Sequence, residues 1–81
     1  MNYQRIHDEI ISRARNRVID DSVYYENHHI IPTSMGGNDD PDNKVKLTGK
    51  EHYLVHWLLY KINPHPKLAY AWHRMSYNPI T

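Results

Sequence analysis

Apolar residues recur at helical spacing near the start of the chain. Steps of three or four residues place them on one face of an amphipathic helix over residues 3–18. That face comprises Tyr3, Ile6, Ile10, Ala14 and Val18. The arginines of this stretch lie mostly off the apolar face. They form either a solvated helix surface or a set of phosphate contacts to a nucleic acid.

Two further helices are predicted after residue 47. Thr48 and Glu51 have the spacing of a capping box, which begins a helix that runs to about Ile62. Asn63-Pro64 ends this helix, and Pro66 suits the first turn of a last helix that continues through about Ser76. The core positions expected on these two helices are Leu54, Val55, Leu58, Leu59, Leu68, Ala71, Trp72 and Met75.

The run VYYENHHII, over residues 23–31, is β-branched and aromatic, which is typical of a strand, and its two tyrosines are expected in the core. Strict alternation places His28 and His29 on opposite faces, so these neighbours cannot do the same job. Residues 32–44 form a turn-rich loop, and residues 45–47 form a short second strand that is antiparallel to the first. The expected fold is α+β, with an N-terminal helix and a C-terminal helix packed around a two-stranded antiparallel hairpin.

The residue composition restricts the possible chemistry of a site more than the net charge does. The chain has 81 residues and no cysteine, which excludes disulfides and thiolate metal sites. Its core should be marginal, because a chain of this size buries only about 60% of its unfolded surface. Seven histidines remain, and imidazole is the strong transition-metal ligand that is left. The net charge of +1 is too balanced to indicate nucleic-acid binding by itself. The sequence has neither a long apolar run nor a signal-peptide pattern, so we expect a soluble cytoplasmic protein. Its length indicates one domain over residues 1–81.

The spacing of the histidines indicates a metal site. His52 and His56 are four residues apart, so they share one face of the predicted helix and are close enough to bind one ion. The helical pair alone is a weak signal, and a strand that offers another histidine strengthens it. Three imidazoles leave an open coordination position, as in catalytic sites, and a fourth beside them can act as general base. Asn43 precedes the second strand, where its amide can bond backbone on both sides of the loop.

These residues resemble the HNH nuclease motif, also called the ββα-metal or His-Me finger. The resemblance extends roughly over residues 26–61, within a motif core of residues 24–62, and the stretches HHIIPTSMGG and EHYLVHWLL are most similar to small bacteriophage HNH endonucleases, including homing types. It rests on His28-His29, Ile30-Ile31-Pro32, Gly36-Gly37, Asn43, Leu47, His52 and His56. It implies a ββα-metal core in which His28, His52 and His56 bind one divalent ion (Mg²⁺, Mn²⁺, Ni²⁺ or Zn²⁺). It further implies that His29 is the general base and that Asn43 holds the loop and orients His29.

The activity that the resemblance implies is hydrolysis of DNA phosphodiester bonds, with 5′-phosphate and 3′-hydroxyl products. The protein would contact mainly the phosphate backbone, as a monomer or homodimer, in the host cytoplasm if a phage encodes it. Candidate cations for the phosphates are Arg13, Arg17, Lys50 and Arg74. Two alternatives stay open. One is a noncatalytic nucleic-acid-binding module that the metal only stabilises, and the other is a nuclease directed at RNA.

Overall fold

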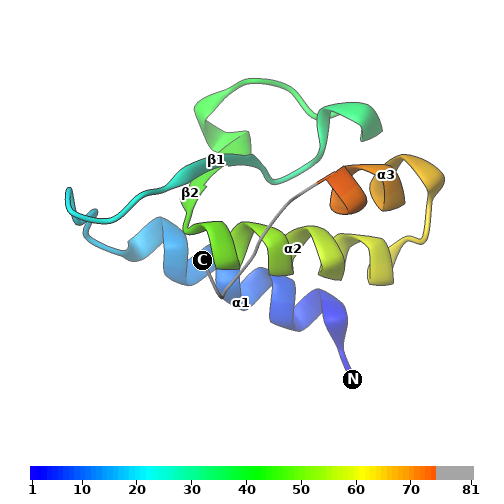
Figure 1. Ribbon diagram of the computed structural model, residues 1–81, viewed down its shortest axis with the longest axis horizontal. Coiled ribbons are helices and arrows are strands. Elements are labelled where there is room, and N and C mark those ends of the chain that lie inside the picture. Colours follow the sequence, from blue (N-terminus) through cyan, green and yellow to red (C-terminus); the bar gives the residue numbers. More distant parts are fainter. Residues whose placement is uncertain (75–81) are drawn as a thin grey trace.

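The central element of the fold is helix α2, Gly49–Ile62 (Figure 1). A computed structural model describes residues 1–74, and the side chains of residues 1–72. Helix α1, Tyr3–Asn16, packs along one side of α2, while the β-hairpin and helix α3, Pro66–Arg74, pack on the other side. The described part of the chain is therefore α+β, with three helices and a two-stranded antiparallel sheet.

Helix α1 forms where its apolar period predicts, but it is shorter than expected. Asn2 caps its first turn by accepting a hydrogen bond from the backbone N–H of Arg5, and the helix ends at Asn16. Ile10 and Ala14 are buried as expected. Val18 is 92% exposed, so its assignment to the apolar face is wrong. The reason is that the backbone becomes extended at Arg17, and helical spacing no longer determines where Val18 points.

The hairpin consists of β1, Glu26–His29, and β2, Lys44–Leu47, in antiparallel register with His28 opposite Val45. Strand β1 is shorter than the β-branched and aromatic run predicts, because only four residues find partners on β2. Tyr24 precedes the paired segment and is 74% exposed, so it is not a core residue. The loop between the strands contains two short 3₁₀ helices, η1 at Thr33–Met35 and η2 at Pro41–Asn43.

Helix α2 begins with the predicted capping box. The Thr48 hydroxyl accepts from the Glu51 backbone N–H at 3.2 Å, and the Glu51 carboxylate accepts from the Thr48 backbone N–H at 2.8 Å. Leu54 is 38% exposed, which corrects its assignment to the core. The core instead lies between α1, β2 and the part of α2 that carries Val55 and Leu58. Its buried members are Ile10, Ile11, Ala14, Val45, Leu47, Val55 and Leu58.

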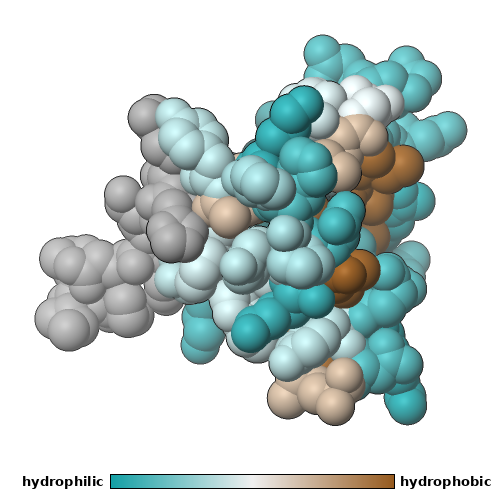
Figure 2. Space-filling model, turned by 90° about the vertical axis from the view of Figure 1, so that its right-hand side faces the viewer, coloured by the Kyte–Doolittle hydropathy of each residue, from teal (hydrophilic) through white to brown (hydrophobic). Residues whose placement is uncertain are grey.

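Helix α3 starts at Pro66, as predicted, and lies beside η1. Leu68 is 3% exposed and anchors it, whereas the expected core position Met75 and the expected end at Ser76 lie outside the described residues. Seen from the side that is on the right in Figure 1, the surface is mostly hydrophilic, with hydrophobic residues gathered toward one edge (Figure 2). No helix in the described part of the chain is long and apolar enough to cross a membrane.

Candidate metal centre

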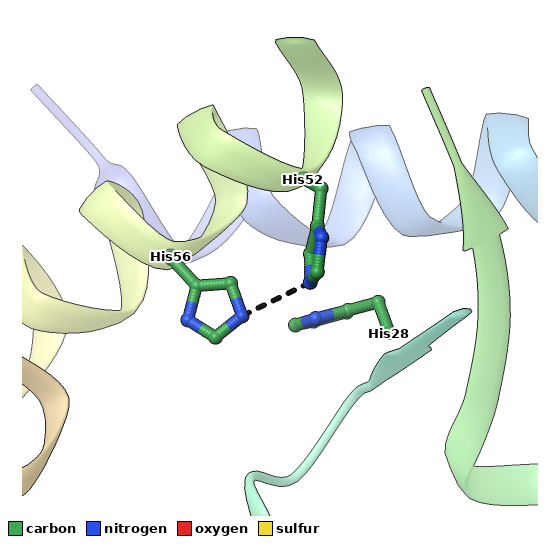
Figure 3. Close-up of side chains that lie close together, drawn as sticks. All are labelled: His28, His52 and His56. Carbon is green, nitrogen blue, oxygen red and sulfur yellow. Dashed lines mark hydrogen bonds between the residues drawn. The ribbon is translucent and has the colours of Figure 1, made fainter. Parts of the chain in front are cut away.

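Three imidazoles converge at one point between the hairpin and α2. His28 comes from β1, and His52 and His56 come from successive turns of α2 (Figure 3). The ring centroids are 4.8–5.1 Å apart in each pair. One ring nitrogen from each residue lies within 4.8 Å of the others. The strand histidine and the helical pair predicted from sequence are thus brought together.

The spacing of the ring nitrogens fits ligation of one ion. Nε2 of His56 lies 3.2 Å from Nε2 of His52. Two nitrogens that bind one tetrahedral ion at about 2.0–2.1 Å are separated by about 3.4 Å, so this pair already has nearly the separation that a shared ion requires. The ring of His28 lies next to both of the other imidazoles and completes the cluster. Imidazole suits zinc, nickel and similar ions, so the donor set is appropriate to a divalent transition metal.

Burial favours the neutral form of His28 and of His56, and the neutral imidazole is the form that binds a metal. Removal from water, together with the neighbouring His56 and His52, lowers the pKa of His28 to about 3. The pKa of His56 falls to about 4 for the same main reason, with a contribution from His52. Within the described residues, both ring nitrogens of His28 and Nδ1 of His56 are buried without a hydrogen-bond partner. Buried polar atoms seldom lack partners, so the cluster has the unused donor capacity expected of a metal site.

Glu26 orients one of these ligands and was not singled out from sequence. Its Oε1 lies 2.8 Å from Nδ1 of His52. A carboxylate there accepts the Nδ1–H proton and leaves the Nε2 lone pair directed at the centre, which is the usual support for a metal-binding histidine. Alternation along the strand puts Glu26 on the face of His28, so the signal was present in the sequence.

His29 lies beside the three-histidine cluster with a different environment. Its side chain is 32% exposed and lines an open cleft together with His52 and His56, whereas His28 is buried. Nε2 of His29 lies 2.6 Å from Oδ1 of Asp39, a contact that sequence reasoning missed. This hydrogen bond lowers the pKa of Asp39, so the carboxylate is the acceptor and Nε2–H the donor. In the neutral form of the ring, Nδ1 of His29 is then the nitrogen with an available lone pair.

Asn43 joins the two ends of the loop between the strands. Its Oδ1 accepts from the Ile31 backbone N–H at 2.8 Å, and its Nδ2 donates to the carbonyl oxygens of Ile31 at 3.0 Å and of Asn38 at 2.8 Å. Its own carbonyl accepts from the Ile30 backbone N–H at 2.8 Å. These bonds fix the backbone directly after His29 and before Asp39. Asn43 is 9% exposed, so water competes little for its amide.

The candidate phosphate-binding cations do not surround the histidines. Arg13, Arg17 and Lys50 line a separate hollow between α1 and the start of α2. Because a helix turns about 100° per residue, Lys50 points about 160° away from His52. Arg17 is already bound to Glu51, at 2.6 Å, while Arg13 and Lys50 have no ion-pair partner in the part of the chain that is described. The side chain of Arg74 lies outside the described residues.

Comparison with known proteins gives several relatives and no family model or solved structure that matches. The chain is 49% identical over 76 residues to "Probable mobile endonuclease D" of Enterobacteria phage T4, a match that covers 89% of this chain and 29% of that protein. It is 48% identical over 75 residues to "Probable mobile endonuclease E" of the same phage, covering 93% of this chain and 52% of that protein. A third relative, "Probable mobile endonuclease B", is 48% identical over 81 residues, with coverages of 96% and 31%. The chain thus spans between about a third and a half of the length of these phage proteins, and its similarity to them supports a phage endonuclease family.

Proposed function

We propose that this chain is a metal-dependent DNA endonuclease of the HNH type. The observation that carries the proposal is the convergence of three imidazoles beside a fourth that lines an open cleft. The names of the relatives support an endonuclease, and the described elements include the two strands and the helix that a ββα-metal core requires. His28, His52 and His56 would bind one divalent ion. The products would carry a 5′-phosphate and a 3′-hydroxyl.

The residues of the chain divide the chemistry between them. A bound divalent ion supplies positive charge beside the scissile phosphate, which stabilises the charge that develops on the leaving 3′ oxygen. His29 takes a proton from the attacking water at Nδ1, because its Nε2–H is held by Asp39. Asn43 keeps this imidazole in place by fixing the backbone that follows it. Glu26 keeps His52 in the tautomer that binds the ion through Nε2.

Plasmid nicking tests the proposal most directly. Supercoiled DNA is incubated with the chain and Mg²⁺, Mn²⁺, Ni²⁺ or Zn²⁺ in turn, with EDTA as the metal-free control. We expect nicking with at least one ion and none in EDTA. His29→Ala should abolish nicking and leave the metal affinity unchanged in calorimetry, since the imidazole of His29 lies outside the three-histidine cluster. His52→Ala should lose both nicking and tight metal binding.

The same experiment separates catalysis from a purely structural metal site. A noncatalytic module would show a metal-induced rise in melting temperature and no nicking with any ion. If His29→Ala nicks at the wild-type rate, the assignment of the base is wrong even if the chain is a nuclease. Parallel reactions on duplex DNA, single-stranded DNA and RNA test the choice of nucleic acid.

A further inference from the structure

An open cleft of about 850 Å³ lies between the histidines and helix α3. On one side it is lined by His29, His52 and His56. On the other side it is lined by residues of η1 and α3, which we name the α3 wall: Thr33, Ser34, Lys67 and Tyr70. A phosphodiester bound in this space would lie beside His29, His52 and His56. The volume is within the range of pockets that hold small organic ligands, so it accommodates a nucleotide.

The α3 wall combines an aromatic ring with a cation. Tyr70 lines the cleft and is 65% exposed. Lys67 is exposed and has no ion-pair partner among the described residues. The first backbone N–H groups of α3 already donate, those of Leu68 and Ala69 to the His65 carbonyl. An anion at this wall would therefore be bound by the Lys67 ammonium and not by the end of the helix.

We propose that the α3 wall binds the nucleotide next to the scissile phosphate, and that this nucleotide is unpaired. The inference rests on the nuclease function proposed above and adds a substrate class to it. The base stacks on Tyr70, Lys67 binds the flanking phosphate, and the hydroxyls of Thr33 and Ser34 are available to polar groups of the nucleotide. A base inside a duplex cannot present its face to a side chain, so stacking requires single-stranded or locally opened DNA.

The alternative is that the cleft accepts only the backbone of intact duplex DNA. In that case Lys67 would matter for affinity and the ring of Tyr70 would not. Base–aromatic stacking and phosphate contacts leave different signatures. Loss of a stacking ring weakens single-strand binding without changing its salt dependence, while loss of a phosphate contact lowers the slope of log Kd against log salt.

Fluorescence anisotropy in EDTA measures binding without cleavage. The probes are a labelled single strand of about 12 nucleotides and a hairpin duplex of the same sequence. We expect Tyr70→Leu to weaken single-strand binding about tenfold. Tyr70→Phe, which keeps the ring, should bind like the wild type. Lys67→Ala should reduce the single-strand salt slope by about 0.7. The matched control is Lys61→Ala, because Lys61 lies about 180° around α2 from His52 and should not change the slope.

The outcomes distinguish this inference from the proposed function. If Tyr70→Leu binds the single strand as tightly as the wild type does, the stacking is overturned. The same holds if this variant loses equal affinity for the single strand and for the duplex. An unchanged salt slope in Lys67→Ala would overturn the phosphate contact. Because Lys67 is exposed, this variant tests binding at the α3 wall even if Tyr70→Leu does not fold. Absence of metal-dependent nicking by the wild type would instead refute the nuclease, since the anisotropy measurements need no catalysis.

Discussion

The metal-free chain should lose stability steeply in mild acid. His28 and His56 have lowered pKa values in the folded state because burial disfavours their charged forms. In the unfolded chain both would titrate near 6.5. Below that pH the unfolded state binds more protons than the folded state, so protonation favours unfolding. The stability is fully present above pH 6.5 and is lost as the pH falls toward the folded pKa values of about 3 and about 4.

The size of the loss follows from these values. At pH 5 each unfolded imidazole is almost fully protonated while each folded one remains neutral. Linkage then gives about 2 kcal/mol for His28 and about 2 kcal/mol for His56, relative to pH 7.5 and above. A domain of this length has a total stability of roughly 4–12 kcal/mol. A loss of about 4 kcal/mol is therefore a large fraction of the total, and it comes from two side chains.

Urea unfolding in EDTA, followed by circular dichroism between pH 7.5 and pH 5, measures this loss. His28→Leu provides the matched variant, because it replaces a buried imidazole with a buried apolar side chain. It should remove about half of the acid destabilisation, since the lowered pKa of His56 arises from burial and His52. It should also abolish the stabilisation that added metal gives. An equal loss between pH 7.5 and pH 5 in His28→Leu and the wild type would refute the reasoning.

Three further substitutions test the supports of the site. Glu26→Gln removes the charge that holds Nδ1–H of His52, and it should weaken Zn²⁺ or Ni²⁺ binding about 10–100-fold in calorimetry; unchanged affinity would exclude the orienting role. Gly37→Ala should destabilise the fold by about 3 kcal/mol or more in urea, because a Cβ there would lie 1.7 Å from the Ile31 carbonyl oxygen. Gly36→Ala should cost only about 1–2 kcal/mol, since no atom lies within 4 Å of its Cβ and only its positive φ is unfavourable; equal costs would contradict this packing argument.

Sequence reasoning located the helices and the three-histidine cluster because local rules determine both. The i, i+4 spacing puts His52 and His56 on one face of α2 whatever surrounds the helix. Alternation puts His28 and His29 on opposite faces of β1 once a strand is present. The capping box that begins α2 is also a local signal, because its two residues, Thr48 and Glu51, are only three positions apart. The ends of the elements were predicted less well: Val18 is exposed because α1 ends two residues before it, and Tyr24 is exposed because β1 begins two residues after it.

The remaining parts of the site depend on contacts between distant segments. Asp39 reaches His29 only because Asn43 folds the loop back, and neither spacing nor periodicity encodes that path. The α3 wall depends on how α3 packs against η1, which is a property of the whole fold. The environment of Arg17 likewise depends on the whole fold. As a helical arginine it is a reasonable phosphate ligand, but in the fold it binds Glu51 and its guanidinium lies 5.5 Å from the ring centre of Tyr25.

The site also affects how the hairpin is held on α2. His28 crosses from β1 into the space beside α2 with two buried ring nitrogens that have no partner in the described chain. Glu26 provides a polar link between the same two elements through His52. An ion bound by histidines of both elements would therefore join β1 to α2 as well as serve catalysis. Since His29 lies on β1 and α3 packs against α2, the distance between the proposed base and the α3 wall depends on this junction. Metal loading should thus set the alignment of the cleft as well as its charge.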